Sequence, residues 1–164
     1  MHFRFPALVV LSVALACSRA PQDPLPGVAL ELAEHRAATI TDVRYDVEFD
    51  IPEAKDSVVR GTVTTSFTLR DASQGLVLDF RAPASHVLGV ELDGDSVEHR
   101  IVPDHIVIPA RAIREGTHAV RVRFRSTDAA LNRNEGFLYA LFVPDRASTA
   151  FPVFEQPDLK ARFT

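Results

Sequence analysis

Two stretches of the chain alternate strictly between apolar and polar residues, which is the period of a β-strand with one buried face. In residues 43–51 every second residue is apolar and the residues between are charged. Residues 59–69 repeat the alternation, and a turn is expected between the two stretches at residues 53–57. The pattern predicts two neighbouring, half-buried strands of an antiparallel sheet.

Shorter apolar runs follow, each bounded by turn-forming residues. They predict strands at residues 76–80, 87–92, 101–102, 106–108 and 120–124. Turn signals return about every ten residues, which is typical of an all-β fold, either an antiparallel β-sandwich or saddle-like curved sheets. Residues 28–39 are rich in Ala, Leu and Glu and predict one short N-terminal helix.

The first residues, 1–17, have the pattern of a secretory signal. His2 and Arg4 give a polar-to-basic start, and residues 7–16 are almost entirely apolar. That run is too short to span a bilayer as a helix, which needs about 20 residues. We therefore expect export. Residues 18–27 are rich in proline and have the composition of a tether, which leaves residues 28–164 as one β domain.

The signal ends in Ala14-Leu15-Ala16-Cys17, and small residues before a cysteine resemble the bacterial lipobox. There the cysteine carries lipid and becomes the mature N-terminus. The usual leucine three places earlier is Ala14 here, and an ordinary cleaved signal with an incidental cysteine is the alternative. Ser18 resembles the Gram-negative pattern for the outer membrane. We expect a periplasmic or outer-membrane lipoprotein of a Gram-negative-type bacterium, attached to the membrane through Cys17.

Charge and cysteine content exclude further classes of function. The net charge is −4 and the two signs are interspersed. Nucleic-acid binding favours clustered Lys and Arg, so we expect no nucleic-acid partner. A single cysteine excludes an internal disulfide and a cysteine-rich metal site. Arg121, Arg123 and Arg125 share one face of a predicted strand. A solvated or interdomain face is favoured there over a site for an anion or acidic lipid.

The last fourteen residues, 151–164, combine turn prolines with a final alternating strand. Pro152 and Pro157 push the residues before them into extended conformations. Pro157-Asp158 predicts a turn, and residues 159–164 then alternate with the two-residue period of a strand. Because the chain stops inside that alternation, we expect a truncated protein.

This segment resembles the sequence that closes the N-terminal domain of aminopeptidase N-type zinc metallopeptidases, a family that includes leukotriene hydrolase. The motif residues are Phe151, Pro152, Phe154, Glu155, Gln156, Pro157, Asp158, Leu159, Lys160 and Ala161. Residues 137–147 resemble the family's tyrosine-containing strand and following loop, and the spacing of Leu32, Arg36 and Ile40 resembles the opening of the domain. The resemblance covers about residues 30–164.

The resemblance implies an N-terminal β domain that packs on a catalytic domain and walls its peptide-binding cleft. The candidate wall residues are Tyr139, Leu141 and Val143. The family commonly has a glutamine and a second polar residue near the substrate amine, where this chain has Leu141 and Val143. These two are apolar and cannot pair with an ammonium group. The alternative is that both are core residues of a buried strand.

The catalytic chemistry of that family is absent from the chain. Its zinc site needs His-Glu-x-x-His on a helix. None of the six histidines is followed by Glu, and the family's Gly-x-Met-Glu-Asn motif is absent because the single methionine is Met1. We assign no catalytic residue, no metal ligand and no cofactor to this chain, and expect zinc in the parent enzyme by resemblance.

Weaker candidates remain open. Glu31 and His35 lie one helical turn apart, but a solvated helix face is favoured over a metal pair. His105 beside Asp104 is expected to be a turn pair. A truncated domain predicts uncovered aromatics, namely Tyr139, Phe142, Phe151, Phe154 and Phe163. The partners expected are the missing catalytic domain, peptide through the parent enzyme, and a membrane. A stand-alone β-sandwich lipoprotein that binds a ligand or protein is the alternative.

Overall fold

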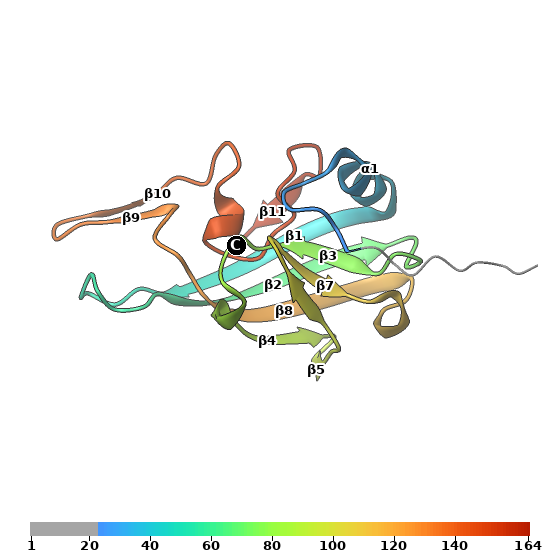
Figure 1. Cartoon of the computed structure of the whole chain (residues 1–164), viewed down its shortest axis with the longest axis horizontal. Helices are drawn as coiled ribbons and strands as arrows, with labels where there is room; N and C mark the ends of the chain where they lie inside the picture. Colours follow the sequence, from blue (N-terminus) through green and yellow to red (C-terminus); the bar gives the residue numbers. More distant parts are fainter. Residues whose placement is uncertain (1–22) are drawn as a thin grey trace, which may run out of the picture.

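The computed structural model describes residues 23–164 (Figure 1). The described residues contain one α-helix, α1 (Leu30–Thr39), and three short 3₁₀ helices, Ala84–His86, Ala110–Ala112 and Ala147–Thr149. The strands are β1 (Ile40–Asp50), β2 (Arg60–Leu69), β3 (Leu76–Asp79), β4 (Val87–Leu92), β5 (Asp95–Ser96), β6 (Arg100–Val102), β7 (His105–Ile108), β8 (Gly116–Arg125), β9 (Leu131–Arg133), β10 (Leu138–Ala140) and β11 (Ala161–Phe163). The predicted all-β fold with a short N-terminal helix is confirmed.

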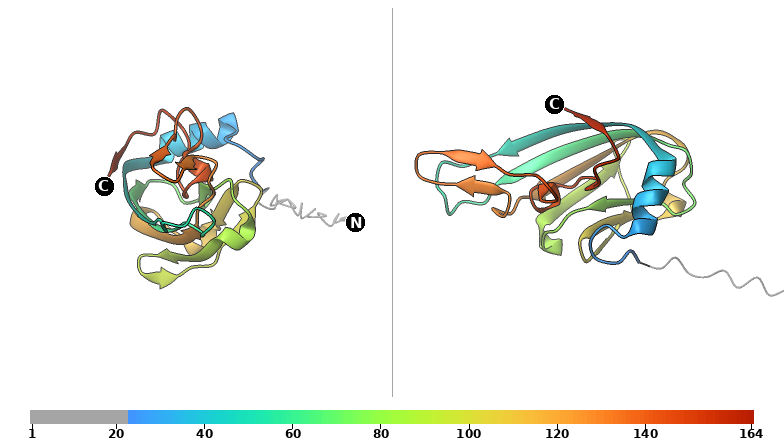
Figure 2. Two further views of the ribbon diagram at one scale, coloured as in Figure 1. Left: turned by 90° about the vertical axis from the view of Figure 1, so that its left-hand side faces the viewer. Right: turned by 90° about the horizontal axis from the view of Figure 1, so that it is seen from above.

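The strands form a six-stranded sheet in the order β11-β1-β2-β8-β4-β5, a three-stranded sheet in the order β3-β7-β6, and the hairpin of β9 and β10. Nearly all pairings are antiparallel, as predicted. The exception is β11, which pairs parallel to β1 with Val43 opposite Ala161 and Tyr45 opposite Phe163. The C-terminal strand therefore lies at one edge of the large sheet (Figure 2).

The alternating stretches bury one face each, because every second side chain points into the core. Val63, Phe67 and Leu69 of β2 are buried, and their neighbours on the strand are at least partly exposed. Gly61 stands where the pattern would place an inward side chain. A Cβ atom at this position would lie 2.4 Å from the ring of Phe124 on β8, so only glycine allows the ring to approach the backbone.

The three-stranded sheet lies against one face of the curved six-stranded sheet, and the two share one core (Figures 1 and 2). Leu78 and Ile106 come from the small sheet, and Val63 and Val122 from the large one; all four are fully buried. Phe80, just after β3, packs edge to face on Phe124 of β8 with ring centroids 5.8 Å apart. Burial of aromatic surface at this contact ties the two sheets together.

The C-terminal motif is part of the core, which corrects one expectation. Phe151 and Phe154, predicted to be uncovered, are 3% and 4% exposed. Phe151 packs on Phe49 of β1 and on Phe142, which is itself half-buried. Tyr139 and Phe163 are exposed, as expected. Both aromatic residues of the motif, Phe151 and Phe154, therefore pack against this domain's own sheet and are not left exposed for a partner.

The described end of the predicted tether lies on the domain. The amide of Gly27 donates to Oδ2 of Asp104 at 3.0 Å, and the carbonyl of Leu25 lies 2.9 Å from Nε2 of His105. Asp23 forms an ion pair with Arg100. Residues 1–22, including the signal pattern and Cys17, lie outside the described residues. In the part that is described, no helix is both long and apolar enough to cross a bilayer.

Candidate functional site

A buried ion pair joins the helix to the small sheet. Arg36 on α1 donates from Nη1 to Oδ2 of Asp79 at 2.8 Å and from Nη2 to Oδ1 at 2.7 Å. The side chains of Arg36 and Asp79 are 2% and 3% exposed. Nη2 also donates to the carbonyl of Val77 at 2.9 Å. The planar guanidinium fits the carboxylate in the two-point geometry that stabilises such pairs most strongly.

Two more groups complete the surroundings of Asp79. Nδ1 of His105, on β7, lies 3.0 Å from Oδ1, and the amide of Glu155 donates to Oδ2 at 2.7 Å. Burial raises the pKa of Asp79, but the hydrogen bonds from His105, Arg36 and Glu155 outweigh it and leave that pKa lowered. Burial lowers the pKa of His105, but its bonds to Asp79 and to the Leu25 carbonyl leave that pKa raised.

The family motif is held by this same cluster. The ring of Phe154 lies 5.3 Å from the guanidinium carbon of Arg36, within cation–π range. Gln156 accepts from Arg36 at 3.5 Å through Oε1 and donates to the carbonyl of Ala33 at 3.2 Å through Nε2. The amide of Phe154 donates to the hydroxyl of Tyr45 at 2.9 Å. Phe154, Glu155 and Gln156 therefore fix the C-terminal segment onto α1 and β3.

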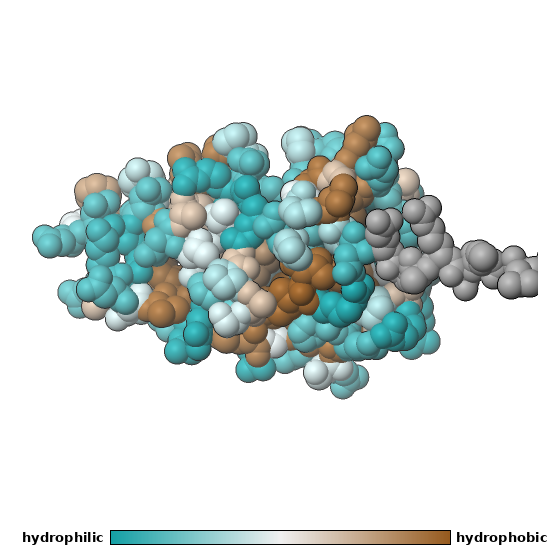
Figure 3. All heavy atoms as spheres, viewed as in Figure 1, coloured by the Kyte–Doolittle hydropathy of each residue, from teal (hydrophilic) through white to brown (hydrophobic). Residues whose placement is uncertain are grey.

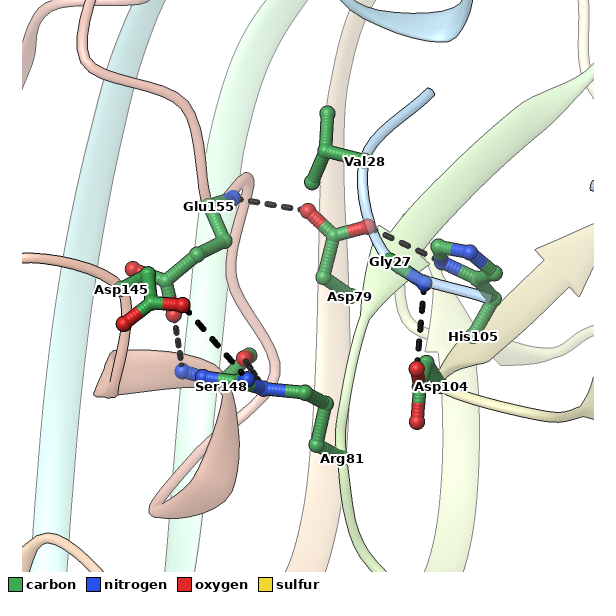
Figure 4. A pocket seen from close by; sticks show the side chains of 9 residues that line it. All are labelled: Gly27, Val28, Asp79, Arg81, Asp104, His105, Asp145, Ser148 and Glu155. Atoms are coloured by element: carbon green, nitrogen blue, oxygen red, sulfur yellow. Dashed lines mark hydrogen bonds and ion pairs between the residues drawn. The ribbon is translucent and has the colours of Figure 1, made fainter. Parts of the chain in front are cut away.

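A pocket of about 160 Å³ opens beside Asp79 and His105 (Figure 4). Its lining residues are Gly27, Val28, Asp79, Arg81, Asp104, His105, Asp145, Ser148 and Glu155. Arg81 donates from Nε to Oγ of Ser148 at 2.9 Å, and the Ser148 amide donates to Oε2 of Glu155 at 2.5 Å. The polar groups of the wall are thus largely paired with one another.

These contacts support a structural role for the cluster. Both ring nitrogens of His105 are engaged, by Asp79 and by the Leu25 carbonyl. Ser148 is 1% exposed and its hydroxyl accepts from Arg81, so it is not paired with a base. A nucleophile needs a base within hydrogen-bond reach. Arg36, Asp79 and His105 instead join α1, β3 and β7 through paired charges.

The residues present do not fit zinc. Among residues 23–164 no group of three or more His, Cys, Asp or Glu side chains has the arrangement of a metal site. Glu31 of the weak metal pair is exposed and His35 is half-buried. The turn-pair prediction for His105 is wrong, because its ring bonds to Asp79, while Asp104 accepts from the Gly27 amide.

The predicted cleft-wall residues lie together on the β9–β10 hairpin and the segment after it, which project from the main body (Figures 1 and 2). Tyr139, Leu141 and Val143 are 51%, 41% and 70% exposed. The alternative that Leu141 and Val143 are core residues of a buried strand is wrong, since β10 ends at Ala140. Phe137 stacks on Tyr139, with ring centroids 6.2 Å apart.

Sequence patterns did not single out Asp79, His105 or Arg36 as one cluster. Asp79 closes an apolar strand, and His105 opens another, each at a position where burial requires a partner. The one sequence feature that could have pointed to this cluster is a charged or titratable residue at the end of a buried apolar run. It indicates that a partner exists, but not which residue supplies it.

No protein-family model matches the chain. It is 31% identical over 153 residues, 85% of its length, to Aminopeptidase N of Streptomyces lividans. The chain resembles the aminopeptidase N-type zinc metallopeptidases. The match covers 18% of the Streptomyces protein, so the chain spans less than a fifth of that curated relative.

Solved structures of aminopeptidase N-type proteins share the fold. The M1 zinc metallopeptidase from Deinococcus radiodurans matches 76% of this chain with a TM-score of 0.64 at 20% identity, over 31% of its own chain. Native leukotriene A4 hydrolase from Saccharomyces cerevisiae matches 89% with a TM-score of 0.66 at 21% identity, over 25% of its own chain. At these identities the likeness concerns the fold. It agrees with the predicted resemblance to an N-terminal domain.

Proposed function

We propose that the chain is the non-catalytic N-terminal domain of a zinc aminopeptidase, an enzyme that removes N-terminal residues from peptides. In this proposal the domain packs on a catalytic domain and walls its substrate cleft. The observation that carries it is the 31% identity to Aminopeptidase N over 85% of the chain, a region that is 18% of that relative. The zinc ligands and the general base then come from another part of the parent enzyme.

The packing surface in this proposal is the apolar patch of the hairpin, formed by Phe137, Leu138, Tyr139, Leu141 and Val143. All five side chains are exposed, and they fall within one short segment. Removing apolar surface from water favours a complex by about 25 cal/mol per Å² before the entropic cost of association is subtracted. Their apolar character suits contact with a protein surface or an apolar substrate side chain, and it excludes an ion pair with a substrate amine.

We further propose that the parent protein is exported and held at the membrane by a lipid on Cys17. The support is the sequence alone, namely the short apolar run, the small residues before Cys17 and the proline-rich stretch after it. Such a tether lets a globular domain stand clear of the bilayer. The expected location is the periplasm or the outer membrane of a Gram-negative-type bacterium.

The native protein tests the peptidase proposal. An antibody raised against residues 23–164 is used to capture the protein from the cells that encode it. We expect a captured protein well above the 18.1 kDa of the chain, which holds zinc and releases amino acids from aminoacyl-arylamides. The purified chain serves as the control and releases none. A captured protein of about the chain's own mass, without zinc or activity, would overturn the peptidase proposal and favour the stand-alone β-sandwich lipoprotein.

A further inference from the structure

A second pocket lies where the loop before β2, the end of β8 and β9 meet. It measures about 310 Å³. Its cationic lining groups are Lys55, Arg125 and Arg133, and its carboxylates are Asp56 and Asp128. A water molecule occupies about 30 Å³ of liquid, so the space admits a small polyatomic ion.

Arg133 lines this pocket and carries a buried donor without an acceptor. Its side chain is 8% exposed, and its Nε and Nη2 donate to Oδ1 and Oδ2 of Asp128 at 3.0 and 3.1 Å. Nη2 also donates to the carbonyl of Ser57 at 2.9 Å. Nη1 is buried and has no partner among residues 23–164. Asp128 is therefore engaged by one edge of the guanidinium, while Nη1 has no acceptor.

Arg125 ends β8 and lines the same pocket. Its Nε is buried and has no acceptor among residues 23–164. The backbone carbonyl of Arg125 accepts from Nδ1 of His86 at 3.0 Å, which holds this end of the strand in place. A buried charged donor left unsatisfied is costly, and an acceptor in the pocket removes that cost.

We propose that this pocket binds a small oxyanion of the phosphate or carboxylate class, with Arg125 and Nη1 of Arg133 as its donors. The planar fork of arginine matches the paired oxygens of such anions. Asp128 is neutralised by Arg133, and Lys55 and Asp56 are exposed charges of opposite sign, which leaves Arg125 as the cation of the wall that no lining carboxylate offsets. This site is separate from the Asp79 cluster, shares no residue with the hairpin patch, and does not depend on the peptidase proposal.

Calorimetric titration of the purified chain with inorganic phosphate tests the site. We expect saturable binding to one site per chain. Arg125→Gln should weaken it about ten- to a hundredfold, because a hydrogen bond to a charged group is lost. Arg121→Gln is the matched control: it removes the same charge from the exposed part of β8 and should leave the Kd unchanged.

Arg125→Lys keeps the charge but loses the planar fork of the guanidinium, so it should weaken phosphate binding by a smaller factor. If Arg125→Gln shows no cooperative unfolding and is therefore not folded, Arg125→Lys takes its place in the test. A parallel titration with acetate gives the Kd of the site for a carboxylate. Absence of saturable phosphate binding would overturn the proposal. Equal weakening by Arg121→Gln and Arg125→Gln would also overturn it, because the attraction would then be a property of the whole strand face.

Discussion

Arg36 and Asp79, 43 residues apart in sequence, meet through two hydrogen bonds of 2.8 and 2.7 Å, and both side chains are buried. The pair joins the single α-helix of the described residues to the small sheet, and Glu155 and Gln156 bond to the same two side chains. The segment that carries the family motif is thus bonded to both partners of a buried charge pair.

Removing one partner of this pair should destabilise the domain strongly. Arg36→Met leaves the Asp79 carboxylate buried beside only His105 and one amide, and we expect a loss of about 3–5 kcal/mol in the free energy of unfolding. The double variant Arg36→Met/Asp79→Leu should recover part of it, since no lone charge remains. Urea unfolding measures both. Arg121→Met, at an exposed position, should stay within about 0.5 kcal/mol, and an Arg36 variant as mild as this control would contradict the assignment.

His105 should make stability depend on pH on the alkaline side. Its pKa is raised above the ordinary 6.5, so its stabilising effect is complete below 6.5 and is lost as pH rises through the raised pKa. Asp79 has a lowered pKa, so its contribution is present above 3.8 and is lost as pH falls through the lowered value. We expect His105→Gln to be less stable at pH 6 and to flatten the decline above pH 6.5. Parallel profiles of the variant and the wild type would refute this account.

The hydroxyl of Tyr45 tests the attachment of the C-terminal motif. It accepts from the buried amide of Phe154, and burial is the main reason that the pKa of Tyr45 is raised. Tyr45→Phe removes one oxygen and leaves that amide without a partner, which should cost about 1–3 kcal/mol. Tyr139→Phe, on the exposed hairpin, makes the same chemical change and should be neutral. Thermal unfolding of the two variants separates the effects.

The hairpin patch should bind apolar probes. Patches of more than a few hundred Å² on a monomer mark interaction surfaces. We expect the purified chain to bind a hydrophobic fluorescent dye, and Phe137→Ser/Val143→Ser to reduce that binding with little change in stability. Leu30→Ser, at another exposed apolar position, is the control. On the face drawn in Figure 3, apolar side chains form separate patches among hydrophilic ones. If the hairpin variant leaves dye fluorescence unchanged, the dye binds another surface and the prediction for the hairpin patch is wrong.

Lipidation of Cys17 predicts membrane fractionation. The wild-type chain, expressed in a Gram-negative host, should partition with membranes and incorporate labelled fatty acid. Cys17→Ser should give either a soluble product or an unprocessed precursor. If wild type and variant fractionate identically as soluble mature protein, the ordinary cleaved signal is the better interpretation.

The sequence by itself determined the longer strands, the short helix and the resemblance to the peptidase family, but not the short strands β5 and β9. Strict alternation in residues 43–51 and 59–69 fits a β-strand and no other regular structure, because a two-residue period exposes one face of a strand and buries the other. The turn prolines in residues 151–157 carry similar local information, since proline restricts its own backbone and that of its neighbour. The absence of His-Glu-x-x-His is likewise fixed by the sequence.

The tertiary structure alone decided which distant residues meet. Asp79, His105 and Arg36 lie on different elements, and no local pattern encodes which carboxylate, imidazole and guanidinium share a buried site. The parallel pairing of β11 with β1, and the exposure of Leu141 and Val143 beyond the end of β10, depend on the same long-range packing. Apolar character predicts burial only where the fold brings a second surface to cover the side chain, and for these two residues the described part of the chain supplies none.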